Sequence, residues 1–346
     1  MQRLSVFLLL VFLAISVNAQ KKGKPKKKKK IPENIEEIKC KFSLSPIYAN
    51  EYSFFKIKSR QNKNADEMIY RPNILGSVGA KMTIKSFSFT YMRALPQPEL
   101  LGNTKSTSYI FNLQKRTFGM KLYWMQYEGL YLDKLNRSHL YSELDNGIDS
   151  NIILRPDIKM DNIGFQNYFT FLKSFSVNAA FEQTERQKKT AGSFVLMYGA
   201  NYLGVSNQQG NSLILPSQKD YYPRVYDLYK LNAISFKIDP GIGYSFIIKR
   251  YFSFTFLLLG GSNIQHKWYH LDGKTRTRWG PWISLNYEAR AAVGYNGKHL
   301  LFNLVYSRSQ DITGFKTTYD DKPYDCTTNF NFFREFIKFT AGFRIY

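Results

Sequence analysis

The histidines are the residues of this sequence best suited to acid–base or metal chemistry. His266 and His270 flank Trp268 and are followed by Asp272. Two imidazoles and a carboxylate could hold a metal ion, or could form a base with its orienting carboxylate. A four-residue spacing places two side chains on one face only in a helix, and this segment has no helical pattern. We therefore predict no metal site, no cofactor and no catalytic set here.

A second group of candidate residues is charged and brackets one predicted hairpin, residues 163–181. The group consists of Asp157, Lys159, Asp161, Glu185, Arg186 and Lys188. Both halves of the group would lie at the same end of that hairpin, where opposite charges attract. We interpret the group as a loop clamp of surface ion pairs, each worth about 0 to 1 kcal/mol. A gate, an assembly contact or a sugar-phosphate site is the alternative.

Two smaller groups combine charge with position on a strand. Glu288 and Arg290 lie on the polar face of a predicted strand, where they could neutralise each other inside a lumen. The start of the same strand carries Arg276, Arg278, Trp279 and Trp282. Basic and aromatic residues together are typical of a barrel where it meets lipid head groups. We predict outer-membrane lipid as the partner there, and specific binding of lipopolysaccharide as a further hypothesis.

These groups must be positioned by strands, because apolar residues alternate with polar ones and change phase at short turns. Examples are residues 78–84 with 87–91, and 236–248 with 252–258. Residues that face each other across a hairpin turn point to the same side of the sheet, as this change of phase requires. The clearest turn is Asn296-Gly297, a pair that tolerates the positive φ of a type I′ hairpin.

Two further strands complete the predicted count. Residues 175–181 would return from 163–171 after a three-residue turn, and residues 212–216 would supply the strand that an even number requires. The short turns alternate with long polar connections near residues 58–75, 94–106, 129–161, 261–280 and 309–331. Short turns on one side and long loops on the other are typical of an outer-membrane barrel with short periplasmic turns.

The composition agrees with such a barrel. The chain has 28 Phe and 25 Tyr, yet its mean hydropathy is −0.36. Only alternate residues of a barrel strand face lipid, and aromatic residues gather at the two membrane interfaces. We predict an all-β fold, an antiparallel transmembrane β-barrel of about 12 to 14 strands with long extracellular loops. A soluble β-sandwich or soluble barrel is the alternative.

Residues 1–39 are predicted to lie outside the barrel. A basic start, an apolar stretch over residues 6–17 and an exit at Ala19 indicate a signal peptide over residues 1–19, too short to span a membrane as a helix. Residues 20–39 are a predicted disordered tail in which Lys21 to Lys30 contribute eight lysines. The tail could bind an anionic periplasmic polymer or serve as a solvated spacer. Because the signal peptide predicts export, the net charge of +23 does not indicate nucleic-acid binding.

The barrel itself is predicted to span residues 40–346. Cys40 and Cys326 would lie at its opposite ends, so we expect them to be unpaired. The last apolar stripe, residues 337–345, stops one residue before the aromatic Tyr346. An aromatic terminus resembles the signal read by the barrel-assembly machinery, which makes that machinery a predicted partner.

Several segments resemble a Bacteroidota outer-membrane β-barrel family that is catalogued as a domain of unknown function. The resemblance rests on residues 155–164 and 185–194, with weaker contributions from Gly241-Ile-Gly-Tyr244 and Tyr295-Asn-Gly-Lys298, and it spans about residues 40 to 346. It implies an outer-membrane location and supplies no catalytic residues.

We therefore expect a non-enzymatic protein of the cell outer membrane, either a narrow pore or a structural or assembly component of the envelope. The alternative is a membrane-embedded hydrolase that acts on lipid or on a substrate derived from the cell wall.

Overall fold

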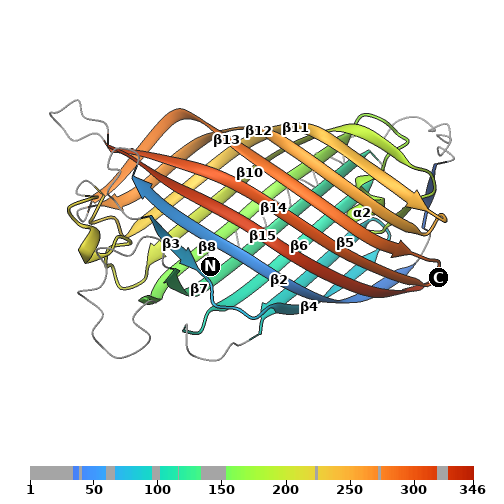
Figure 1. The fold of residues 1–346 in the computed structure, drawn as a ribbon, viewed down its shortest axis with the longest axis horizontal. Helices are drawn as coiled ribbons and strands as arrows, with labels where there is room; N and C mark the ends of the chain where they lie inside the picture. Colours follow the sequence, from blue (N-terminus) through green and yellow to red (C-terminus); the bar gives the residue numbers. More distant parts are fainter. Residues whose placement is uncertain are drawn as a thin grey trace, which may run out of the picture. The chain divides into compact units, whose positions relative to one another are not determined.

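The computed structural model describes residues 34–38, 41–59, 67–95, 102–115, 117–133, 153–222, 225–271, 274–317 and 326–346. Within these ranges no helix has the length and apolar character needed to cross a membrane. Nearly all of the regular structure is one antiparallel sheet (Figure 1).

The sheet closes on itself as a barrel. Its 13 strands include β3, and the others form a ring that is sealed by pairing of β15 with β2. In ring order these are β2 (Phe42–Ser59), β4 (Ser77–Ile84), β5 (Phe87–Ala94), β6 (Lys105–Lys115), β7 (Phe118–Asp133), β8 (Ile153–Thr170), β10 (Ala191–Asn207), β11 (Lys230–Ile248), β12 (Phe252–Leu271), β13 (Lys274–Asn296), β14 (Leu300–Thr317) and β15 (Cys326–Ile345). The predicted antiparallel barrel is confirmed, at the lower end of the predicted strand range.

The two ends of the barrel differ in their connections. Short connections at residues 85–86, 116–117, 249–251 and 297–299 lie at one end, which we call the turn end. The chain terminus Tyr346 lies at the same end, on the right in Figure 1. Most of the longer connections lie at the opposite end, which we call the loop end. Two places differ: β12 and β13 occupy most of the predicted long connection near residues 261–280, so only two residues separate them there, and the connection of residues 171–190 lies at the turn end.

The strand β3 (Met68–Arg71) fills a part of the wall that two short strands leave open. β4 and β5 have eight residues each, so they cover only the half of the wall nearest the turn end. At the loop end β3 fills the gap, because Tyr70 pairs with both Phe55 on β2 and Leu132 on β7. Shortly after β3, the backbone N–H of Asn73 donates to Thr104 Oγ1 at 2.8 Å, which joins this segment to the residue that precedes β6.

The two faces of the wall differ in the way that the alternation predicts. Side chains such as Phe194, Phe236 and Leu285 point outward and are 57–75% exposed. The residues between them point into the barrel and are mostly buried, and many are polar. The outside of the barrel is therefore an apolar surface, and the inside is a mixed core.

Close packing across the inner face depends on one glycine. Gly164 on β8 lies between Tyr123 on β7 and Asn201 on β10. The Tyr123 ring lies over the glycine, and its hydroxyl donates to Asn201 Oδ1 at 3.0 Å. A side chain at position 164 would collide with that ring, so the glycine is what allows this bond between strands that are not neighbours.

Two predicted strands are absent, which is a correction. Residues 175–181 are buried and contain the helix α2 (Val177–Phe181), whose N-cap Ser176 accepts a bond from the Ala179 N–H at 3.1 Å. β8 pairs directly with β10 instead. Residues 212–216 lie in the connection from β10 to β11, which contains the 3-10 helix η2 (Pro216–Gln218). Without these two strands the ring has 12 strands instead of the predicted 14, which is still an even number and lets the antiparallel ring close.

The boundary of the predicted tail also needs correction. β1 (Ile35–Glu37) pairs with β9 (Glu185–Gln187) in a separate two-stranded sheet, so ordered structure begins before residue 39. The predicted signal peptide, Lys21 to Lys30 and Cys40 lie outside the described residues, whereas Cys326 begins β15 at the loop end.

Candidate functional site in the barrel lumen

The middle of the lumen holds a buried pair of opposite charges. Glu288 and Arg290 both point inward from β13 and are 2% and 8% exposed. The Arg290 guanidinium donates to the Glu288 carboxylate and to the Tyr168 hydroxyl. It also lies over the rings of Tyr168 and Phe181, at 5.0 and 5.8 Å from the two centroids. A single cation thus joins strands β13 and β8 to the segment that contains α2.

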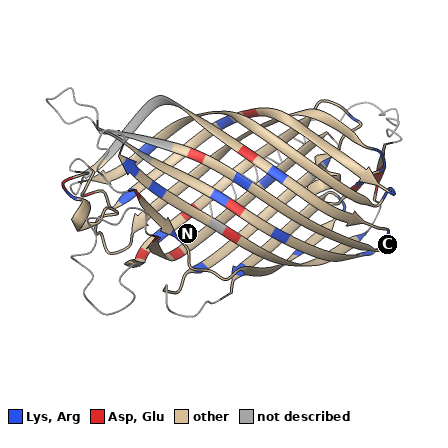
Figure 2. Cartoon of the chain, in the orientation of Figure 1, with Lys and Arg blue, Asp and Glu red and all other residues tan. Residues whose placement is uncertain are grey.

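Further charges surround this pair at the same level of the barrel. Lys237 Nζ lies 3.6 Å from Asp311 Oδ1, and the Arg334 guanidinium lies 5.0 Å from the centre of the Tyr123 ring. Figure 2 shows that acidic and basic positions occur on the strands between the two ends of the barrel. A buried charge is costly unless it is paired and hydrogen-bonded. The layer therefore consists of mutually dependent pairs, and loss of one member leaves another uncompensated.

The turn end of the lumen is filled by the connection between β8 and β10, residues 171–190, which we call the plug. Its apolar side chains, including Phe175, Val177, Ala180 and Phe181, pack in one cluster with wall residues such as Leu257 and Val305. Phe175 is completely buried. The label of α2 in Figure 1 marks this segment within the turn-end half of the barrel. The plug is thus part of the hydrophobic core.

Polar contacts fasten the plug to the wall on several sides. Bonds from the wall reach backbone oxygens of the plug: Asn303 Nδ2 donates to Ala180 O at 3.1 Å, and Asn296 Nδ2 donates to Glu185 O at 2.8 Å. In the opposite direction, Asn178 Nδ2 donates to the Lys115 carbonyl at 2.6 Å. Because these contacts reach strands β6, β13 and β14, no single rotation would free the plug.

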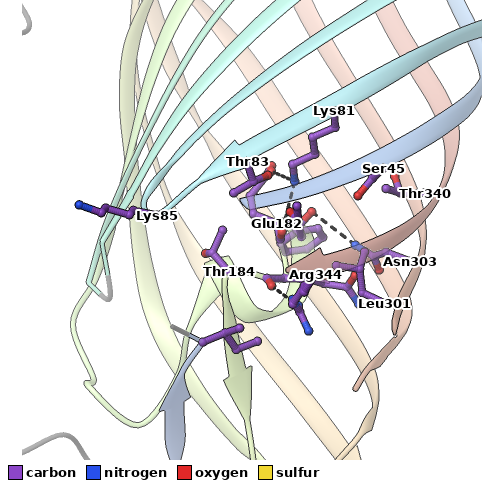
Figure 3. Close-up of a pocket in the computed structure, with 14 residues that line it drawn as sticks. Ser45, Lys81, Thr83, Lys85, Glu182, Thr184, Leu301, Asn303, Thr340 and Arg344 are labelled. Carbon is purple, nitrogen blue, oxygen red and sulfur yellow. Dashed lines mark hydrogen bonds and ion pairs between the residues drawn. The ribbon is translucent and has the colours of Figure 1, made fainter. Parts of the chain in front are cut away.

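A pocket beside the plug contains the strongest of these contacts (Figure 3). Lys81 Nζ lies 2.5 Å from Glu182 Oε2, and both side chains are largely buried. Burial is the largest single influence on the Glu182 carboxyl and raises its pKa, but the ammonium groups of Lys81 and Lys338 together lower it, so the net pKa is below its usual value. Arg344 on β15 donates to the Gln183 carbonyl at 2.6 Å. Two cations of the wall therefore hold two successive plug residues.

The loop end of the lumen is closed by a second apolar cluster. The connection from β10 to β11, residues 208–229, buries Leu213, Ile214 and Leu228 against inward-facing residues of the wall. The Tyr70 hydroxyl donates to the Leu213 carbonyl, and Arg155 Nη2 donates to the Ser212 carbonyl at 2.8 Å. The described residues therefore fill the lumen at both ends, with the charged layer between them.

The structure does not bring together the two halves of the predicted loop clamp. Arg155 pairs with Asp157 at 3.0 Å at the loop end, near the positions of Lys159 and Asp161 on β8. Glu185 accepts a bond from Ser176 Oγ at 2.6 Å at the turn end. The other residues of that half, Arg186 and Lys188, are also in the plug, and Arg186 pairs with Glu36 at 3.2 Å. The length of β8 separates the halves because residues 175–181 do not form the predicted strand.

The remaining candidates lie on strands near the loop end. Arg276, Arg278, Trp279 and Trp282 are on β13, and their side chains lie outside the described residues. His266 and His270 are both on β12, where four residues span about 13 Å. That separation is too large for one metal ion, and Asp272 lies outside the described residues. Among described residues no cluster of His, Cys, Asp or Glu could hold a metal ion.

Sequence reasoning missed the contacts that close the lumen. Lys81 and Arg344 alternate with apolar residues on their strands, so their inward direction was visible as a pattern. Their partners, Glu182 and Gln183, belong to a segment that was predicted to lie at the opposite end. Only the pairing of β8 with β10 places that segment inside the barrel.

Comparisons with known proteins give one family match and no activity. A family model described as Domain of unknown function (DUF4421) matches residues 34–344. No curated protein matches the sequence.

Solved structures with some similarity include the following three. The outer membrane protease OmpT from Escherichia coli has 6% identity and a TM-score of 0.39, over 88% of this chain and 96% of that one. The P. putida toluene transporter TodX has 8% identity and a TM-score of 0.28, over 91% of both chains. Ail, the attachment invasion locus protein of Yersinia pestis, has 10% identity and a TM-score of 0.20, over 87% and 98%. At these scores the likenesses carry no inference about activity.

Proposed function

This chain belongs to the family described as Domain of unknown function (DUF4421), and we propose that it is a closed β-barrel of the Gram-negative outer membrane that serves as a structural or assembly component of the envelope. The filling of both ends of the lumen carries this proposal. Of the two roles expected from the sequence, it favours the envelope component over the narrow pore.

The membrane location is supported by the outer surface of the barrel. Large apolar side chains are exposed on strands all around the ring, from Leu44 on β2 to Ile345 on β15. Soluble monomers rarely expose a continuous apolar patch of more than a few hundred Å². A barrel in lipid has the opposite arrangement, with apolar residues outside and polar residues in the lumen. The inward-facing charged layer fits that arrangement.

The closed state is supported by the way in which the plug is held. Barrels of about 8 strands are filled by their own side chains, and those of 16 to 18 strands leave an aqueous channel. A barrel of intermediate size needs an inserted segment to close it, and residues 171–190 supply one. Apolar burial and bonds to several strands together make the plug a fixed part of the core.

Cell fractionation tests the proposed location. We expect the protein in the outer-membrane fraction, where it resists extraction by alkaline carbonate and migrates differently on gels with and without boiling. Ile238, which is halfway along β11 and 61% exposed, provides a variant. Ile238→Lys should lower the stability of the membrane-embedded protein by about 2 to 4 kcal/mol, because a cation on the lipid face is destabilising. A processed protein that is monomeric in water without detergent would overturn the proposal.

A further inference from the structure

The turn end carries exposed cations at its connections. We call the group formed by Lys85, Lys115, Lys173, Lys249, Arg250 and Lys298 the basic rim, and all six side chains are exposed. The exposed acidic residues at this end, within the described ranges, are Glu36 and Glu37, and Glu36 pairs with Arg186. The right-hand end of Figure 2 shows basic residues at the tips of the strands. The rim is therefore a surface of positive potential.

Backbone conformation gives an independent reason to connect the basic rim with a ligand. Lys85, Lys249 and Arg250 have φ values of +53°, +50° and +65°. An L-residue in this left-handed region is disfavoured by about 1 to 2 kcal/mol, and Gly and Asn tolerate it best. By contrast, neither Asn296 nor Gly297 has a positive φ, so the type I′ turn predicted at this pair is not formed and the left-handed positions of the short turns fall on cations instead. Cations thus occupy positions where the backbone favours other residues, which indicates that the positive charge has a role of its own.

The position of the rim selects the class of partner. Lys85 lies between Ile84 and Phe87, and the exposed side chains of these two point out from the barrel wall. The pair Lys249 and Arg250 is bracketed in the same way by Ile248 and Phe252. In a barrel surrounded by lipid, residues directly beyond the last apolar side chains lie at the level of the head groups. A lipid phosphate is therefore nearer to these cations than a polymer beyond the membrane.

We propose that the basic rim binds the anionic head groups of phospholipids in the leaflet at the turn end. This inference rests on the proposed membrane location. A basic residue close to an anionic membrane surface contributes about 1 kcal/mol, so several cations around one rim give a clear preference for anionic over zwitterionic lipid.

Lipid retention tests the proposal with the full-length processed protein. The protein is reconstituted in vesicles of equal parts phosphatidylglycerol and phosphatidylethanolamine, extracted in mild detergent, and analysed for retained lipid by mass spectrometry. We expect severalfold enrichment of phosphatidylglycerol that falls as salt increases. The variant Lys85→Asn/Lys249→Asn/Arg250→Gly should lower this enrichment at least about threefold. Its thermal midpoint should be unchanged or higher, because the new residues suit the backbone. Undiminished enrichment would overturn the proposal.

Two further variants separate local charge from other effects. Lys58→Gln/Lys105→Gln/Lys219→Gln removes the same charge from exposed positions at the loop end and should leave retention unchanged. An equal loss in this control would show that only net charge matters, which contradicts a site at the rim. Lys115→Gln/Lys173→Gln/Lys298→Gln leaves the left-handed positions intact and should also reduce retention. Protein that enters vesicles without lipid preference refutes this inference alone, whereas protein that stays in water refutes the membrane location.

Discussion

Replacing Arg290 with methionine is expected to lower the free energy of unfolding by about 3 to 5 kcal/mol. The substitution leaves the Glu288 carboxylate buried without its cation and removes the bond to the Tyr168 hydroxyl. It also removes the contact of the guanidinium with Phe181 of the plug. Urea unfolding in lipid vesicles, followed by tryptophan fluorescence, measures the change.

Two comparisons make the Arg290 result specific to a buried pair. The double variant Glu288→Gln/Arg290→Met should recover much of the loss, because it leaves no buried charge unpaired. Arg308→Met changes an exposed arginine on β14 and should have a small effect. An Arg290→Met variant as stable as Arg308→Met would show that the lumen is hydrated and open at that level.

Phe175→Ala in the plug is expected to lower the free energy of unfolding by about 3 to 5 kcal/mol, the usual cost of removing a buried aromatic ring. Phe175 is completely buried between the plug and the wall, where its ring contacts the backbone at Gly243. The same variant should make the plug accessible to trypsin, which would then cleave after Arg186, a plug residue that is buried in the wild type. Urea unfolding and limited proteolysis in vesicles together measure both effects.

Phe171 provides the matched control for this prediction. It is also in the plug segment, but its ring is 59% exposed and lies beside Phe169 at the outer surface. Phe171→Ala should therefore cost far less and leave the trypsin pattern of the wild type. Equal effects of the two substitutions would mean that residues 171–190 do not occupy the lumen.

The barrel could be predicted from the sequence because its dominant signal is local. Apolar residues alternate around short turns such as Lys85-Ser86, and this hairpin has the register that a two-residue turn requires, with Ile84 paired to Phe87. The plug could not be predicted in this way. Phe175, Val177 and Phe181 also alternate, but they do so in a segment that is buried on all sides, where spacing no longer distinguishes a strand from a short helix.

The same distinction separates the site residues that were predicted from those that were not. The inward direction of Glu288 and Arg290 followed from their place on the polar face of one strand. Their partner Tyr168 is more than a hundred positions away in the sequence, and only the closure of the ring brings it near. The predicted loop clamp failed because one false strand moved Glu185 to the wrong end of the barrel.

Closure of the lumen thus depends on three layers of different chemistry. Apolar cores occupy the two ends, and paired charges occupy the middle. Water and ions cannot pass through an apolar core without displacing it. Two charged contacts tie the apolar core at the turn end to the wall. The Arg290 guanidinium lies over the Phe181 ring, and Lys81 forms an ion pair with Glu182.

Single-channel recording in a planar lipid bilayer is the most direct test of this closed barrel. Purified full-length protein, shown by heat-modified mobility to be folded, should insert without producing current steps at moderate voltage. Reproducible steps of constant conductance from the folded wild-type protein would contradict the closed lumen.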